Sequence, residues 1–179
     1  MMKVKVTTRM MTYAALFGVL TFVFGFIRIP VGPVPITLQT LAVLMAGLLL
    51  KPATSCLAML LHAFLKIILG GSSPFVSPGF GFVLAFVVAS PLLSFLTQRN
   101  KGNCVRTALN IAAVTFLIYI LGLPYMALVL RFYLNQTITF GNILMTGMVV
   151  FLPGDALKAV TAWFLAYRLT PFSDKTGTT

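Results

Sequence analysis

The chain has 179 residues, of which 59% are hydrophobic and only 8% are charged, and its mean hydropathy is +1.03. Soluble domains carry about 25% charged residues, so this composition excludes an ordinary soluble domain. It predicts a single all-α integral membrane domain over residues 1–179, located in the cell membrane. The formal net charge is +11. No nucleic-acid-binding motif accompanies this charge, so we interpret the basic residues as flanks of membrane helices and expect no nucleic acid partner.

Six apolar segments approach the roughly 20 residues that a membrane helix needs. We expect six transmembrane helices over about 10–27, 37–50, 54–70, 79–97, 105–130 and 153–169. The stretch 138–152 is also apolar and holds two glycines. It predicts a short helix or a re-entrant piece that leads into the sixth helix.

The first predicted helix carries a stripe of small residues. Ala14 and Gly18 are four positions apart, and Ala15 is adjacent to Ala14. Small residues at this spacing let another helix approach closely. The stripe therefore predicts a helix contact, either with another helix of this chain or with a partner subunit.

The second predicted helix begins after the prolines of PVPITLQT with Thr37, Gln39 and Thr40. A glutamine inside an apolar run needs a hydrogen-bond partner. Two interpretations stay open here. In the first, Thr37 caps the helix and Gln39 bonds to a neighbouring helix. In the second, both residues contact a ligand.

Lys66 lies within the third predicted helix, and His62 lies one turn deeper on the same face. The lysine either extends toward the outer headgroups or meets a ligand, whereas the histidine is expected to be a packed, hydrogen-bonded residue. Ser72 and Ser73 follow in the next loop, where small hydroxyls serve either turn formation or ligand contacts.

The distribution of basic residues predicts the orientation of the chain. With both termini in the cytoplasm, the outside receives only Arg28 and Arg131, and nine basic residues are cytoplasmic. These nine are Lys3, Lys5, Arg9, Lys51, Arg99, Lys101, Arg106, Arg168 and Lys175. The outer connections are then rich in Gly, Pro, Ser and Thr, which favours a site open to the exterior over simple turns.

The sixth predicted helix opens with FLPGDALKAV, which holds Asp155 and Lys158. Residues three apart share a helix face, and the first turn of a helix favours a carboxylate. A charge inside the membrane costs about 3 kcal/mol on insertion scales, so it needs a partner or a cavity. The two residues are either a structural ion pair with a lysine extending to the surface, or an acid–base pair that binds a ligand.

The inventory of catalytic groups is small. The patterns GxxxxGK[ST], HExxH and GxSxG are absent, and the chain has one His, two Asp and no Glu. Cys56 and Cys104 lack metal-ligand spacing, so we expect free thiols and no metal site. We predict that the chain is not an enzyme, does not hydrolyse ATP itself and uses no cofactor.

The chain contains three segments in the order found in the BioY family, namely PVPITLQTLAVLMAGLLL, YILGLPYMALVL and FLPGDALKA. It resembles this family over nearly its whole length. These proteins are biotin-capturing membrane subunits of energy-coupling factor (ECF) transporters. The resemblance implies six helices, a high-affinity biotin pocket facing outward, a transmembrane coupling subunit and two ATPase subunits. Asp155 and Lys158 match the signature residues that contact the vitamin, and Ala14 and Gly18 match the docking face.

Biotin offers two ureido N–H donors, a ureido carbonyl, an apolar thioether ring and a carboxylate. We expect the binding residues to be Asp155, Lys158, Gln39, Thr37, Lys66, Phe82, Ser72 and Tyr125, with Phe82 where the family usually has a tyrosine. Partner docking is expected at Ala14, Ala15 and Gly18. The alternative is a stand-alone, ion-coupled secondary transporter for a small polar metabolite, with Asp155 as the proton site.

Overall fold

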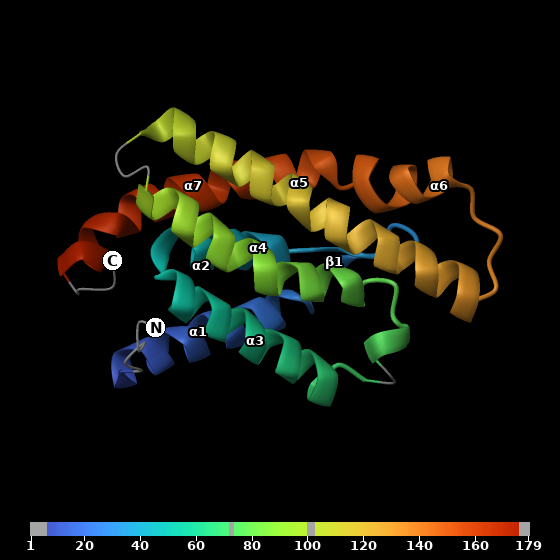
Figure 1. Cartoon of the computed structure of the whole chain (residues 1–179), viewed down its shortest axis with the longest axis horizontal. Coiled ribbons are helices and arrows are strands. Elements are labelled where there is room, and N and C mark those ends of the chain that lie inside the picture. Colours follow the sequence, from blue (N-terminus) through green and yellow to red (C-terminus); the bar gives the residue numbers. More distant parts are fainter. Residues whose placement is uncertain (1–6, 72–73, 100–102, 176–179) are drawn as a thin grey trace.

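The computed structural model describes residues 7–71, 74–99 and 103–175, with 170–175 described by their backbone only. The chain is mostly helical, and its long helices lie side by side (Figure 1). The helices are α1 (Thr8–Phe24), α2 (Gln39–Leu49), α3 (Pro52–Leu69), α4 (Phe80–Arg99), α5 (Cys104–Leu128), α6 (Phe140–Leu144) and α7 (Leu152–Lys175). The expected ranges agree with the ends of α1–α5 and with the start of α7 to within three residues, whereas α7 ends six residues beyond the expected end.

Four helical stretches in the described part of the chain are long and apolar enough to cross a membrane. They are Pro52–Leu69, Phe80–Arg99, Cys104–Tyr133 and Phe140–Leu169. Helices α1 and α2 are apolar but shorter, with 17 and 11 residues. The span Phe140–Leu169 includes most of the stretch 138–152, which was expected to be a short helix or a re-entrant piece. This stretch is mostly helical and leads into α7.

Two π-helices occur in this region, one directly after α5 and one directly after α6. The π-helix η2 (Val129–Tyr133) extends α5, and the π-helix η3 (Met145–Val149) joins α6 to α7. Gly147 lies in η3 against α5, where an added β-carbon would lie 2.5 Å from Leu123 Cδ2. The missing side chain lets this irregular turn pack directly on α5, which positions the beginning of α7.

The helix ends follow from local sequence. Thr7 caps α1, since its hydroxyl accepts a hydrogen bond from the Met10 amide at 3.3 Å. Asn103 caps α5 in the same way, accepting from the Arg106 amide at 3.0 Å. Pro52 occupies the start of α3, where its missing N–H removes no helical hydrogen bond.

The small-residue stripe of α1 packs within the chain. Ala14 and Gly18 are buried, and a β-carbon added to Gly18 would lie 2.8 Å from the carbonyl oxygen of Ala58 in α3. Ala15 is exposed. The expectation of a partner-docking surface at Ala14 and Gly18 therefore needs correction. Gly18 allows the close approach of α1 and α3, Ala14 is buried in the core, and of the three residues only Ala15 faces outward.

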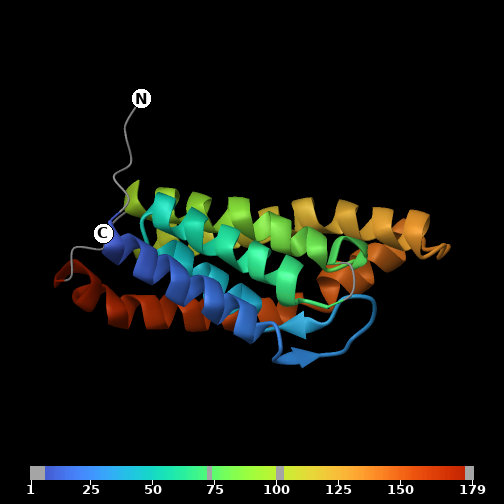
Figure 2. The same cartoon turned by 90° about the horizontal axis from the view of Figure 1, so that it is seen from below.

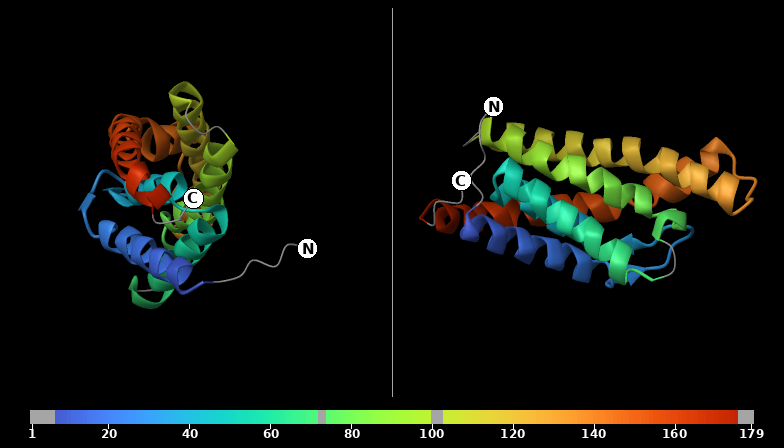
Figure 3. Two further views of the ribbon diagram at one scale, coloured as in Figure 1. Left: turned by 90° about the vertical axis from the view of Figure 1, so that its left-hand side faces the viewer. Right: turned by 60° about the horizontal axis from the view of Figure 1, so that its bottom comes forward.

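A short antiparallel hairpin follows α1, where the sequence indicated only a loop. Strand β1 (Arg28–Ile29) pairs with β2 (Ile36–Thr37), with Arg28 opposite Thr37 and Ile29 opposite Ile36. Strands of two residues, separated by a loop that holds three prolines, carry too little alternation to be predicted from sequence. The hairpin lies at the end of the bundle opposite to the start of α1 and the end of α7 (Figures 2 and 3).

Candidate functional site

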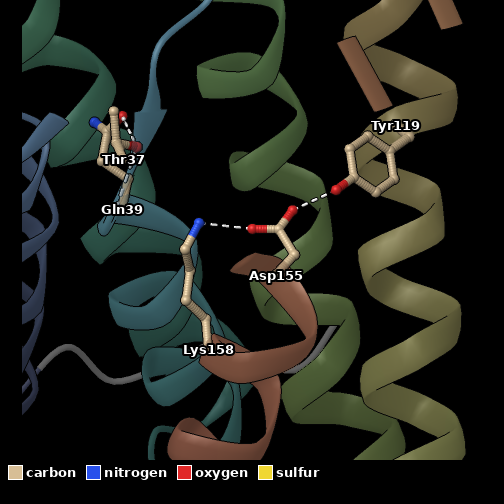
Figure 4. A network of polar contacts seen from close by, with 5 residues as sticks. All are labelled: Thr37, Gln39, Tyr119, Asp155 and Lys158. Atoms are coloured by element: carbon tan, nitrogen blue, oxygen red, sulfur yellow. Dashed lines mark hydrogen bonds and ion pairs between the residues drawn. The ribbon is translucent and has the colours of Figure 1, made fainter. Parts of the chain in front are cut away.

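Asp155 is at the centre of a buried polar network in the first turn of α7. The ammonium of Lys158 donates to Asp155 Oδ1 at 2.7 Å, and the hydroxyl of Tyr119 in α5 donates to Oδ2 (Figure 4). Each carboxylate oxygen therefore has a donor from the protein. The location at the helix N-terminus adds the favourable field of the backbone dipole.

The ion pair is withdrawn from the protein surface. The exposed fractions of Asp155 and Lys158 are 6% and 7%, and the Lys158 side chain points to Asp155. The interpretation of Lys158 as a lysine extending to the bilayer surface is therefore wrong, while the predicted contact within the pair is confirmed. A buried ion pair contributes little to stability, because desolvation offsets most of the attraction. Its position beside a cavity thus favours a role in binding.

Gln39 at the start of α2 forms a second polar group with Thr37 and His62. The Thr37 hydroxyl donates to Gln39 Oε1 at 3.2 Å, and it also accepts from the Gln39 backbone amide at 3.4 Å. The side-chain nitrogen of Gln39 lies 3.3 Å from Nε2 of His62 in α3. The predicted helix–helix bond of Gln39 is therefore present, and His62 is packed and hydrogen-bonded as expected.

Both polar groups border one cavity, with a volume of about 150 Å³. It lies among the hairpin and the helices α2, α3, α4, α5 and α7. Six of the eight predicted binding residues line it, namely Thr37, Gln39, Lys66, Phe82, Asp155 and Lys158. The structure thus brings together side chains that are far apart in the sequence.

The charges and rings around this cavity define the ligand that it suits. Three cationic side chains, from Arg28, Lys66 and Lys158, line it together with one carboxylate, that of Asp155. Phe82 adds an apolar wall and lies edge-on to Tyr119, with ring centroids 6.5 Å apart. An excess of positive charge beside an apolar wall suits a partly apolar ligand that carries an anionic group and hydrogen-bonding groups.

Two predicted residues do not join this site. Tyr125 is absent from the cavity lining; its hydroxyl donates to the backbone oxygen of Phe75 at 2.6 Å, and its ring packs beside Phe80. Tyr125 therefore holds the 3₁₀ turn η1 (Pro74–Val76) on the bundle, and its assignment to the ligand is corrected. Ser72, the other predicted residue, lies outside the described residues.

Tyr119 is the site residue that sequence reasoning missed. Its hydroxyl contacts Asp155 across 36 positions of the chain, and its ring is buried. A tyrosine in an apolar span needs a partner for its hydroxyl, and this was the available signal. The signal does not say which polar group is the partner, because that depends on how α5 packs against α7.

A separate apolar groove of about 350 Å³ lies between α5 and α7. Alanines of both helices line much of it, together with Phe116 and Trp163. Tyr119 and Asp155 line both this groove and the polar cavity. The hydrogen bond between them therefore lies where the two spaces meet.

The sequence profile of the BioY family matches residues 2–175. The probable biotin transporter BioY of Bacillus subtilis is 34% identical over 173 residues, covering 89% of each chain. The biotin transporter BioY of Lactococcus lactis is 29% identical and again covers 89% of each chain. A crystal structure of the S-component for biotin from an ECF-type ABC transporter superposes with a TM-score of 0.69 at 26% identity, covering 93% of this chain and 95% of that one. The chain thus belongs to the BioY family.

Proposed function

We propose that the chain captures biotin at the cell membrane as the substrate-binding subunit of an ECF-type importer. The observation that carries this proposal is the buried Asp155–Lys158 pair, which faces the polar cavity in a member of the BioY family. The names of its relatives and of the superposed crystal structure support biotin as the ligand. The chain is a binding subunit of a transporter and not an enzyme.

The chemistry of biotin matches the groups that line the cavity. Asp155 has lone pairs beyond those used by Lys158 and Tyr119, so it can accept a ureido N–H. The Lys158 ammonium or the Gln39 amide donates to the ureido carbonyl. Phe82 packs against the thioether ring, while Lys66 or Arg28 pairs with the carboxylate. The ligand thus places donors against acceptors in a site shielded from water, where hydrogen bonds to charged groups are strong.

Transport requires energy that this chain does not supply, since its sequence lacks an ATP-binding phosphate loop. We propose a transmembrane coupling subunit and two ATPase subunits as its partners. In this arrangement α1–α5 and α7 are the six membrane helices, and both termini are cytoplasmic. On α1, docking uses the exposed face that carries Ala15, while Ala14 and Gly18 hold the helix on α3.

Calorimetry with biotin on the purified chain tests the proposal. We expect saturable binding of one biotin per chain without any partner subunit. Absence of binding under conditions where the chain is folded would overturn it. Uptake by the purified chain alone in ATP-free liposomes, driven by a proton gradient, would instead favour the ion-coupled secondary transporter.

A further inference from the structure

The fully buried His62 lies behind the wall of the polar cavity, next to the lining residue Gln39. His62 has no exposed surface, and among the described residues it is not part of the cavity lining. Its Nε2 lies 3.3 Å from the side-chain nitrogen of Gln39, which does line the cavity. The hydrogen-bonded route from His62 to a ligand therefore passes through Gln39, while the His62 ring also lies 6.2 Å from the ring of Phe86, another lining residue.

The orientation of the Gln39 amide determines the tautomer of His62. The amide nitrogen of Gln39 is only a donor, so the imidazole nitrogen that faces it accepts. His62 is then neutral and carries its hydrogen on Nδ1. This Nδ1 is buried and has no hydrogen-bond partner among the described residues.

The Gln39 amide is confined on three sides. His62 accepts from its nitrogen, and the Thr37 hydroxyl donates to its oxygen at 3.2 Å. The end of α1 forms the third side, where a β-carbon on Gly25 would lie 2.8 Å from the amide nitrogen. The amide is thus held in one place before any ligand arrives, and such preorganisation favours binding.

We infer that His62 is a positioning residue that fixes the orientation of the Gln39 amide toward the ligand, an inference that rests on the proposed function of the cavity. An amide turned by half a rotation exchanges its donors and its acceptor. Against a ureido ring, a reversed amide meets a donor with a donor or an acceptor with an acceptor. Reversal also requires the His62 hydrogen to move to Nε2 and the Thr37 hydroxyl to turn, so the amide changes orientation only when both partners change with it.

A purely structural role explains these contacts less well. A buried polar atom without a partner destabilises a fold, and Nδ1 of His62 is such an atom. A leucine at this position would fill a similar volume and remove the unpaired Nδ1, but it would leave the Gln39 amide nitrogen without the acceptor it has here. These two effects oppose each other, so we expect His62→Leu to keep the melting temperature of the chain close to the parental value while it weakens ligand binding. If His62 served packing alone, its replacement would not lower ligand affinity while leaving the melting temperature intact.

The test measures biotin affinity by calorimetry, together with melting temperature, on the full chain and its variants. His62→Leu should weaken binding about tenfold, as expected for the loss of one hydrogen bond. His62→Gln puts an amide oxygen near the position of Nε2 and should restore most of the affinity. His62→Asn carries the same amide one methylene shorter and should not. In a Gln39→Leu background, His62→Leu should cause no further loss, because the inferred effect passes through the Gln39 amide.

Parental affinity in the folded His62→Leu variant would overturn the inference. A tenfold loss that persists in the Gln39→Leu background would do the same. If His62→Leu does not fold, equal affinities of His62→Gln and His62→Asn would overturn it. A parent chain that does not bind biotin would remove the proposed function and this inference with it, whereas any of the other results leaves the proposed function standing.

Discussion

The hydroxyl of Tyr119 and the carboxylate of Asp155 join α5 to α7 through one buried hydrogen bond. On its other oxygen, the same carboxylate accepts from Lys158 of its own helix at 2.7 Å. One side chain thus connects a contact within a helix to a contact between helices. Substitution of each partner separates what these contacts do for binding from what they do for stability.

Asp155→Asn tests the charge at the centre of the site. The substitution keeps the size of the side chain and one acceptor oxygen but removes the charge, and charge-assisted hydrogen bonds are roughly twice as strong as neutral ones. We expect a loss of biotin affinity of about 10- to 150-fold, measured by calorimetry. Near-parental affinity in a folded Asp155→Asn variant would show that the carboxylate serves the fold and not the ligand.

Lys158→Met should reveal the pairing through non-additive effects on stability. The variant leaves the buried Asp155 carboxylate without its cation, which destabilises a protein by about 3–5 kcal/mol. The double variant with Asp155→Asn contains no uncompensated charge, so it should be more stable than the two single effects predict. Melting temperatures of the parent, both single variants and the double variant measure this coupling. Strictly additive changes would contradict a direct ion pair.

Tyr119→Phe and Tyr125→Phe form a matched pair. Each variant removes one hydroxyl from a tyrosine of α5, but only the Tyr119 hydroxyl bonds to a charged group. We expect Tyr119→Phe to lower stability by about 1.5–3 kcal/mol and to weaken biotin binding, because Asp155 loses a contact that orients it. Tyr125→Phe should leave affinity unchanged, since Tyr125 does not line the cavity. A larger effect on affinity from Tyr125→Phe would contradict this assignment.

Substitutions on α1 separate packing from docking. Gly18→Leu should destabilise the isolated chain, because a side chain there meets Ala58 and Leu61 of α3 within 3.1 Å. Ala15→Leu should leave melting temperature and biotin affinity unchanged, since Ala15 is exposed, yet it should weaken co-purification with the coupling subunit. Intact assembly in the Ala15→Leu variant would move the docking surface away from this face of α1.

Cysteine labelling in intact cells tests the orientation. Cys56 and Cys104 are free thiols, and Cys104 is exposed. In a Cys56→Ala variant, Cys104 should remain protected from a membrane-impermeant reagent, because the predicted topology places the start of α5 on the cytoplasmic side. Gln136→Cys, in a background without both native cysteines, should be labelled, since Gln136 is exposed in the connection at the opposite end of α5. The reverse pattern would invert the predicted topology.

Features that depend on local spacing were predictable from the sequence. The lengths of the apolar runs gave the positions of the helices, and the spacing of three residues gave the contact between Asp155 and Lys158. The polar character of Gln39 in an apolar run indicated that it has a partner. In each case the relevant distance lies within one helix or follows from the cost of burying a polar group.

Features that depend on packing between helices were not predictable. The partner of Gln39 is His62, which lies 23 positions away, and the choice depends on how α2 rests on α3. The small-residue stripe at Ala14 and Gly18 suited an internal or an external neighbour equally well. Tyr125 follows Tyr119 by six residues, which turns it to another face of α5, so an aromatic residue near the site in sequence lies outside it in space.

The polar cavity and the apolar groove are separated at Tyr119 and Asp155, which line both. The boundary between the polar and the apolar space is therefore a phenol ring and a carboxylate joined by one hydrogen bond. Any movement that draws the Tyr119 hydroxyl of α5 away from Asp155 of α7 breaks this bond. The same movement removes a donor from the carboxylate that is proposed to hold the ligand. Separation of α5 from α7 at this point is thereby coupled to the hydrogen bonding of the proposed ligand residue.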